Sequence, residues 1–247
     1  MSTLIERVKE RGLPRHIALI MDGNGRWAKR RDLPRTAGHQ AGTQAAERLI
    51  RFARQQLGLP YLTLFAFSTE NWDRPAAEVD FIMDLLDRFI REKLSEFEKE
   101  GVRVVVSGDI ERLPESLQQA IINAIHTTAE NDRLVLNVAL NYGAREEIVR
   151  ACRDIARTVM KEGIDPATID KDTVARALYT HEIPNPDLII RTGGEVRLSN
   201  FLLWQSAYAE LYFTPTLWPD FTPAELVQAI TDYQGRERRF GAVEEGK

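Results

Sequence analysis

The stretch HIALIMDGNGRWAKRRDLPRTAGHQAG, residues 16–42, decides how this chain folds. Residues 17–20 are an apolar run that predicts a buried strand, and the run ends abruptly at the sequence DGNG, residues 22–25. Two glycines within three residues let the backbone turn sharply and bring its N–H groups close to a ligand, as in phosphate-binding loops. A basic cluster follows within ten positions, made of Arg26, Lys29, Arg30, Arg31 and Arg35. This order of strand, acid, glycine turn and basic cluster indicates an anionic ligand.

Asp22 is the acidic member of this stretch. Among so many phosphate-binding groups it indicates a divalent cation between acid and phosphate, and Mg²⁺ prefers such oxygen ligands. The plain alternative is an ordinary turn followed by a solvated basic face. A phosphotransferase of the haloacid dehalogenase type would need a second Asp at position 24, where Asn24 stands. A P-loop is excluded because the loop lacks the G-x-x-x-x-G-K-[ST] motif.

Length and composition limit the class of protein. The 247 residues show no Pro/Gly/Ser-rich linker, so we expect one domain over 1–247. A hydrophobic fraction of 43% and a charged fraction of 28% are typical of a globular protein with a sizeable core. The net charge of −4 argues against a general nucleic-acid binder. Cys152 is the single cysteine, which fits a reducing cytoplasm, and its helical apolar surroundings predict a buried thiol. Neither a signal peptide nor a membrane span is apparent.

Strand and helix patterns alternate along the chain. A leading helix within 1–14 precedes the first strand at 16–21. Further strands are predicted at 61–67, 102–107, 134–140, 188–190 and 211–213, and helices at 37–57, 75–100, 115–130, 146–161 and 223–234. The second strand, YLTLFAF, is apolar on both faces, as in a central parallel strand covered by helices. The chain therefore predicts an α/β fold with a mostly parallel central sheet.

Ligands of open parallel sheets bind beyond the carboxyl ends of the strands. The first strand ends in DGNGR at 22–26, the second in STENWDR at 68–74, and a later one in RTGGE at 191–195. Arg197, Ser199 and Asn200 follow closely behind the last of these. Three strand ends thus combine Arg with small polar residues that can bind phosphate oxygens, and we expect them to converge at one edge.

Five segments together resemble the signature blocks of the cis-prenyltransferases. They are MDGNGRWA at 21–28, FSTENWDRP at 67–75, IRTGGEVRLSN at 190–200, FLLWQSAYAELYF at 201–213 and RERRFG at 236–241. The likeness is greatest to the bacterial enzymes that make undecaprenyl diphosphate. It implies a Mg²⁺-dependent transferase that condenses isopentenyl diphosphate repeatedly onto an allylic diphosphate, usually farnesyl diphosphate, to make a lipid carrier for cell-wall sugars.

The resemblance assigns two diphosphate sites. It places the allylic diphosphate on Gly23, Asn24, Gly25 and Arg26, helped by Arg35, His39 and Arg74. It places isopentenyl diphosphate on Arg191, Arg197 and Ser199, with Leu198 between them. Trp27, Ser68, Thr69, Glu70 and Trp72 complete the pocket. Arg35 and His39 are one helical turn apart and can face the same oxygens; by itself, His39 would be an ordinary surface histidine, and Arg191 an ordinary ion-pair partner.

The resemblance also assigns metal and proton chemistry. Asp22 is the expected Mg²⁺ ligand, joined by Glu210, whose carboxylate in an apolar segment needs a metal or a cationic partner. Asn71 is a poor base because its amide is neutral, so we expect it to orient substrate while a diphosphate oxygen, water or Asp22 takes the proton. In the C-terminal tail, 235–247, Arg236, Arg238 and Gly241 are expected to reach the neighbouring site of a homodimer.

A growing polyprenyl chain needs an apolar tunnel. We expect it along the long helix and the second and fourth strands, although such residues are usually plain core. The candidates are Phe81, Leu85, Phe89, Leu94, Ala66, Leu134, Val138 and Leu140. The expected product implies a cytoplasmic protein with transient contact at the inner face of the membrane. The alternative is a non-catalytic subunit of the same fold that binds prenyl diphosphates.

Overall fold

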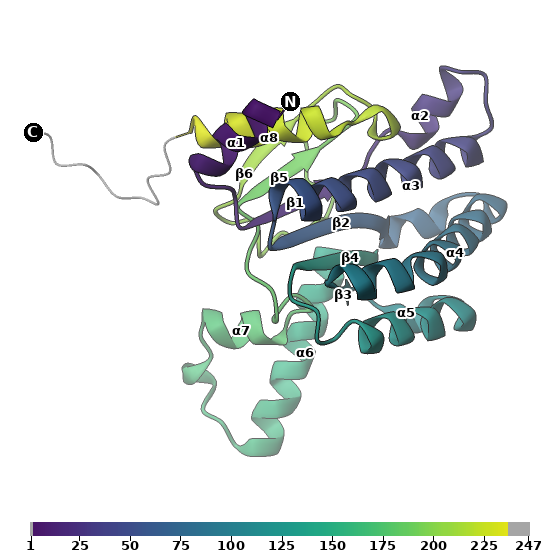
Figure 1. The fold of residues 1–247 in the computed structure, drawn as a ribbon. Coiled ribbons are helices and arrows are strands. Elements are labelled where there is room, and N and C mark those ends of the chain that lie inside the picture. The colour runs from purple at the N-terminus through teal and green to yellow at the C-terminus, as the bar shows by residue number, and fades with distance from the viewer. Residues whose placement is uncertain (1, 237–247) are drawn as a thin grey trace, which may run out of the picture.

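The structure is a computed structural model and describes residues 2–236. Its centre is a six-stranded sheet with the order β3-β4-β2-β1-β5-β6, in which every neighbouring pair is parallel. The strands are β1 (His16–Ile20), β2 (Tyr61–Ser68), β3 (Val102–Ser107), β4 (Leu134–Tyr142), β5 (Leu188–Arg191) and β6 (Glu210–Phe213). The predicted α/β class with a parallel central sheet is confirmed (Figure 1).

Helices surround this sheet. They are α1 (Ser2–Glu10), α2 (Asn24–Lys29), α3 (Arg35–Phe52), α4 (Ala76–Glu100), α5 (Glu115–Thr127), α6 (Ala144–Glu162), α7 (Lys171–Ala177) and α8 (Pro223–Gln234). Short 3₁₀ segments include η2 (Thr69–Asp73) and η5 (Trp218–Asp220), and η1 (Ala53–Leu57) is a π-helical extension of α3. None of these helices is both long and apolar enough to cross a bilayer.

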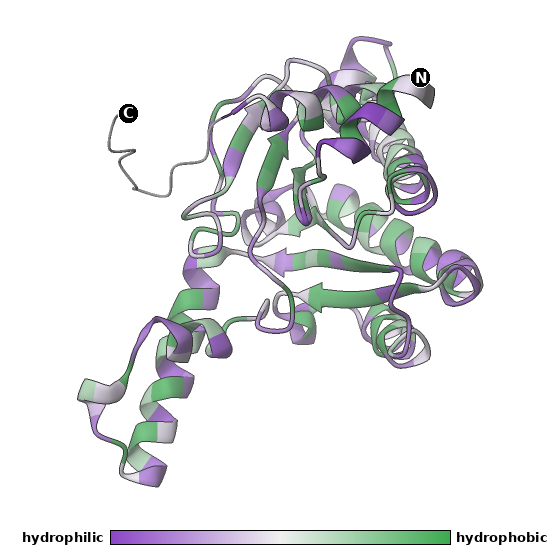
Figure 2. Cartoon of the chain, turned by 60° about the vertical axis from the view of Figure 1, so that its left-hand side comes forward, coloured by the Kyte–Doolittle hydropathy of each residue, from purple (hydrophilic) through white to green (hydrophobic). Residues whose placement is uncertain are grey.

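The two faces of the sheet are covered differently. One face presents Ile17, Leu19, Leu62 and Leu64 to a large apolar cluster, which includes residues of α3 and α8. On the opposite face, Phe201 and Leu202 pack in a second apolar cluster together with Ala144 of α6. The Phe201 ring stacks on Phe65 of β2 with their centroids 4.4 Å apart. Figure 2 shows the apolar colour concentrated on the strands and on the helix surfaces that meet them. Burial of both faces explains the continuous apolar runs of β1 and β2.

The turn predicted after β1 is confirmed at Gly23, which has a φ of 117°. The helix α2 was not predicted; it begins directly afterwards at Asn24 and packs closely on α3. At Gly38 of α3, an added Cβ would lie 2.1 Å from the Asn24 carbonyl oxygen, so only glycine permits this packing. The expectation that the Cys152 thiol is buried was wrong, because Cys152 is exposed. The helix α6 extends away from the sheet, and only a few of its residues are buried against other elements (Figure 1).

Candidate active site

The carboxyl ends of β1 and β5 meet around the carboxylate of Asp22. Its Oδ2 lies 3.0 Å from Arg191 Nη2 and 3.1 Å from Arg26 Nη2. Parallel pairing of β1 with β5 aligns Ile20 with Arg191, which places the residues after Ile20 beside this guanidinium. The Thr192 hydroxyl donates to the Asp22 carbonyl oxygen at 2.7 Å, which fixes the backbone at the turn. Two of the three strand ends that were predicted to converge, those of β1 and β5, therefore meet here.

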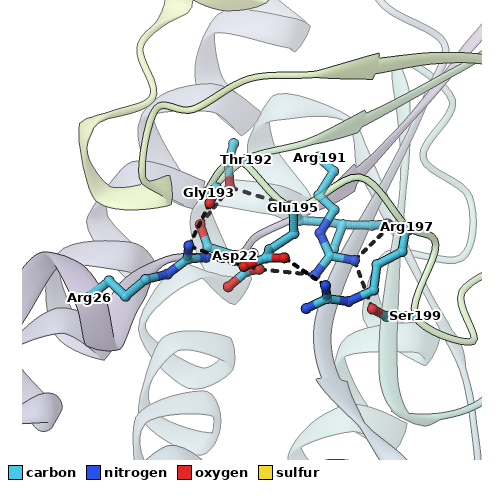
Figure 3. A network of polar contacts seen from close by, with 9 residues as sticks. Asp22, Arg26, Arg191, Thr192, Gly193, Glu195, Arg197 and Ser199 are labelled. Carbon is cyan, nitrogen blue, oxygen red and sulfur yellow. Dashed lines mark hydrogen bonds and ion pairs between the residues drawn. The ribbon is translucent and has the colours of Figure 1, made fainter.

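The second half of the cluster continues from Arg191 to residues 195–199 (Figure 3). Arg191 Nη1 donates to the Arg197 carbonyl oxygen at 2.6 Å and to Ser199 Oγ at 2.7 Å. The side chain of Arg191 is only 5% exposed, whereas that of Arg197 is 60% exposed. Glu195 joins the exposed arginines, with its oxygens 2.6 Å from Arg197 Nη1 and 3.6 Å from Arg26 Nη1. Three arginines and two acids therefore form a continuous network.

A buried acid contacts the remaining residues that were predicted for the allylic diphosphate site. Glu78 of α4 is 8% exposed and contacts Arg35, His39 and Arg74 at 2.9, 3.0 and 3.0 Å. Burial acts to raise the pKa of Glu78, but hydrogen bonds from His39 and Arg35 outweigh it and the pKa lies below its usual value. Burial lowers the pKa of His39 despite its bond to Glu78, so the imidazole is predominantly neutral at pH 7. Arg35 and His39, one helical turn apart, thus contact the same carboxylate. Their contact with a diphosphate stays a prediction.

Glu78 was not among the predicted site residues, although the sequence carries a signal for it. It occupies the apolar stripe of α4, in line with Ile82, Leu85 and Phe89 at helical spacing. A carboxylate on a buried stripe requires a polar partner. That position could therefore have identified Glu78 as the partner of the predicted cations.

The segment after β2 is held by a capping box. The Ser68 side chain accepts from the Asn71 N–H, and the Asn71 side-chain oxygen accepts from the Ser68 N–H at 3.2 Å. The adjacent Thr69 hydroxyl donates to Glu70 at 3.3 Å. The side-chain oxygen of Asn71 thus shapes the loop, and its expected role of orienting substrate stays a prediction.

Several predicted residues lie away from the Asp22 network. The Trp27 indole donates to Asp220 at 2.7 Å, at the contact between α2 and η5, and the Trp72 indole donates to Asn141 at 2.7 Å. Glu210 is at the opposite, amino-terminal end of β6 and pairs with Arg236 at 2.8 Å. The expectation that Glu210 joins Asp22 at one metal site is therefore wrong within a single chain. Asp22 follows β1 at the carboxyl edge of the sheet, whereas Glu210 begins β6 at the opposite edge, and β5 lies between the two strands. Arg238 and Gly241 lie outside the described residues.

An apolar cavity begins next to this site. It contains about 980 Å³ of empty space, including the part open to solvent at its mouth. Met21, Asn24 and His39 line the end near the arginines, while Phe97, Val104 and Leu136 line the end between the helices and the sheet. Of the predicted tunnel residues, the cavity is lined by Leu85, Phe89, Ala66, Val138 and Leu140, and Phe81, Leu94 and Leu134 are not among its lining residues.

Comparison with known proteins agrees with this arrangement. A family model described as "Putative undecaprenyl diphosphate synthase" matches residues 20–241. The chain belongs to the cis-prenyltransferase family. The isoprenyl transferase of Heliobacterium mobile is 53% identical over 97% of this chain and 92% of that protein. The corresponding values for the isoprenyl transferase of Geobacillus kaustophilus are 50%, 96% and 92%.

Solved structures of cis-prenyltransferases share the fold. Lavandulyl diphosphate synthase from Lavandula x intermedia, in complex with dimethylallyl diphosphate, superposes with a TM-score of 0.89 at 40% identity, covering 93% of this chain and 99% of that one. A "probable undecaprenyl diphosphate synthase" from Campylobacter jejuni gives a TM-score of 0.75 at 37% identity with the same coverage. Family membership makes this chain a prenyltransferase.

Proposed function

We propose that the chain condenses isopentenyl diphosphate repeatedly onto farnesyl diphosphate to give a long polyprenyl diphosphate, namely undecaprenyl diphosphate for carrying cell-wall sugars. One observation supports this most strongly. The arginine network around Asp22 adjoins the mouth of an apolar cavity, so charged head groups and a growing hydrocarbon chain have adjacent places. Relatives named isoprenyl transferase, about 50% identical to this chain, agree with prenyl transfer.

The two diphosphates are assigned to different parts of the network. Arg26 and the N–H groups of the loop after β1 hold the allylic diphosphate. The residues around Glu78, namely Arg35, His39 and Arg74, help to bind it. Arg191, Arg197 and Ser199 hold isopentenyl diphosphate. Breaking the allylic C–O bond leaves negative charge on the departing diphosphate, and fixed guanidinium groups stabilise that charge without rearranging.

We propose Mg²⁺ as the cofactor, with Asp22 as its ligand from the protein. The donor set fits, because Asp22 is a partly exposed carboxylate beside groups suited to phosphates. Within residues 2–236, no three acidic, His or Cys side chains cluster as a complete metal cage. Mg²⁺ commonly binds through one or two carboxylates together with substrate phosphates and water. When bound, it neutralises charge on the leaving diphosphate.

Proton removal completes each addition. The amide of Asn71 is not basic and only its oxygen is held by the capping box, so we assign it the role of orienting the reacting chain. The proton from C2 of the isopentenyl unit passes to a diphosphate oxygen, to water or to Asp22.

We further propose a homodimer with transient membrane contact. Val196, directly before Arg197, is 72% exposed and offers an apolar side chain to a partner beside the proposed site. The tail from Arg236 onward would then reach the partner's site. Because the product is apolar, we place the protein in the cytoplasm with peripheral contact at the inner face of the membrane during release.

The test is incorporation of labelled isopentenyl diphosphate into butanol-extractable product with farnesyl diphosphate, with and without Mg²⁺, resolved by chain length. We expect Mg²⁺-dependent incorporation and a ladder ending at the undecaprenyl length. A shorter or longer ladder would contradict only the assigned product. Binding of farnesyl diphosphate without any incorporation would instead assign the chain as a non-catalytic subunit.

A further inference from the structure

Asn200 lies at a junction of three elements outside the residues assigned to substrate. Ser199 and Asn200 have φ values of +50° and +60°, in the left-handed region that non-glycine residues seldom adopt. Among residues other than glycine, asparagine tolerates this region well because its short polar side chain can form local hydrogen bonds. Such a conformation persists where surrounding contacts fix it, and it is common at functional sites.

The first set of contacts connects Asn200 to the start of α6. Its carbonyl oxygen accepts from the Ala144 N–H at 2.8 Å, and its Oδ1 accepts from the Arg145 N–H at 2.9 Å. These N–H groups belong to the first turn of the helix and have no partner within it. Asn200 therefore caps α6 from a distant part of the chain.

The second set connects Asn200 to the loop after β2. Its Nδ2 donates to Glu70 Oε1 and to Glu146 Oε2, both at 3.0 Å. Hydrogen bonds, among them the one from Asn200, lower the pKa of Glu70 although burial acts to raise it. The junction is closely packed, since a Cβ at Gly143 would lie 2.1 Å from Glu146 Oε2 and 2.8 Å from Asn200 Nδ2.

The residues next to Asn200 and Glu70 in the sequence belong to the proposed site. Ser199, directly before Asn200, accepts from Arg191 at 2.7 Å, and Asn71 directly follows Glu70. One amide thus joins the loop that carries the isopentenyl diphosphate ligands to the loop that carries Asn71, with α6 as a rigid support.

We propose that Asn200 is a positioning residue that fixes Ser199 and the Arg197 backbone relative to Asn71, and thereby sets the affinity for isopentenyl diphosphate. This inference rests on the proposed function of the site. The positioning role uses both polar atoms of the side-chain amide. Oδ1 accepts from the first turn of α6, and Nδ2 donates to Glu70 and Glu146.

The experiment uses variants that separate these halves. Asn200→Asp keeps an acceptor for the Arg145 N–H but places a carboxylate against Glu70 and Glu146. Glu146→Gln in the same chain provides an amide that can donate to the new carboxylate. Asn200→Gly suits the left-handed backbone and removes the side chain altogether. Glu146→Gln alone is the matched control, because Asn200 can still donate to its amide oxygen.

We expect Asn200→Asp and Asn200→Gly to raise KM for isopentenyl diphosphate about tenfold, while KM for farnesyl diphosphate changes less than about twofold. Adding Glu146→Gln to Asn200→Asp should recover most of this loss, and Glu146→Gln alone should behave as the unaltered chain. Unchanged KM values with only a lower Tm, or an equal rise for both substrates without rescue, would overturn the inference.

The site assignment is tested separately by Ser199→Ala. If this change also leaves KM for isopentenyl diphosphate unaltered, the proposed site is wrong. If Ser199→Ala raises that KM while the Asn200 variants do not, only the positioning role is wrong.

Discussion

Asp22 and Arg191 form an ion pair that joins the ends of two neighbouring parallel strands, with Oδ2 and Nη2 3.0 Å apart. The arginine is almost completely buried and also donates to Ser199 and to a backbone carbonyl. Asp22 therefore has two tasks: it balances a buried positive charge, and it presents a carboxylate at the proposed reaction centre.

Asp22→Asn should abolish most activity without unfolding the protein. The amide still offers an oxygen to Arg191, which keeps its other two acceptors. Loss of the charged ligand should lower kcat by about 10²-fold or more, comparable to removal of a group that stabilises developing charge. Steady-state kinetics and a thermal melt provide the measurement. Asp154→Asn is the control, because Asp154 pairs with Arg150 and Arg157 on α6, away from the network, and equal losses in both variants would contradict the role of Asp22.

Leu140→Ala should shift the product ladder toward longer chains. Leu140 is fully buried and lines the apolar cavity, so its truncation enlarges the space for the chain end. Leu134→Ala is the matched control, since Leu134 is equally buried but is not among the lining residues. Both should lose about 2–5 kcal/mol of stability. Thin-layer separation of labelled products gives the readout, and a ladder unchanged by Leu140→Ala would remove this side chain as a determinant of length.

Stability should fall between pH 6.5 and pH 4 because of His16. Its Nδ1 bonds the Pro184 carbonyl, which can only accept, so the proton is on Nδ1 and Nε2 accepts from the Thr63 hydroxyl. Burial lowers the pKa of His16 from 6.5 to about 4, although the Pro184 bond opposes the shift. Above pH 6.5, His16 is neutral in both states and does not lower the free energy of unfolding. Below pH 6.5, the unfolded chain binds a proton at His16 before the folded chain does, so the free energy of unfolding falls by about 3 kcal/mol in total.

Denaturant unfolding measured across this pH range checks the prediction. His16→Gln should flatten the slope between pH 6.5 and pH 4 while leaving any acid loss at lower pH, where carboxylates with lowered pKa such as Glu78 are protonated. A slope as steep in His16→Gln as in the unaltered chain would assign the effect to other groups.

Glu78→Gln should weaken binding of the allylic substrate. The buried carboxylate holds Arg35, His39 and Arg74 together, and a neutral amide cannot balance the two guanidinium groups. KM for farnesyl diphosphate should rise about three- to tenfold, with a smaller change for isopentenyl diphosphate. Glu47→Gln, which alters an ion-pair cluster on the outer side of α3 and α4, is the control. A selective rise in KM for isopentenyl diphosphate would contradict the assignment.

Much of the fold followed from the sequence because apolar periodicity and strand ends are local signals. The sheet and the meeting of Asp22 with Arg191 are of this kind, since parallel strands must end at one edge. The helix α2 could not be predicted in this way, because Gly25 in its first turn opposes helix formation and packing against Gly38 stabilises it. Cys152 had a helical pattern, but the pattern does not tell whether another element covers that side.

The partners of charged side chains were harder to predict. Arg35, His39 and Arg74 were identified as a set, but the acid that gathers them was not. Glu210 was correctly expected to need a partner, and the structure supplies Arg236. Pairings between distant charges depend on tertiary geometry, which spacing along one helix or strand cannot supply.

Asn24 and His39 line one end of the cavity, and Figure 3 shows Arg197 and Ser199 on the opposite side of Asp22 from Arg26, which is assigned with Asn24 to the allylic diphosphate. On the proposed assignment, each new diphosphate is left on the far side of Asp22 after a condensation. The lengthened product must then carry its head group past Asp22 before the next addition, while its tail slides deeper between the sheet and α4. Elongation would thus be a stepwise translocation in which the charged end shuttles over a short distance and the hydrocarbon end advances in one direction only.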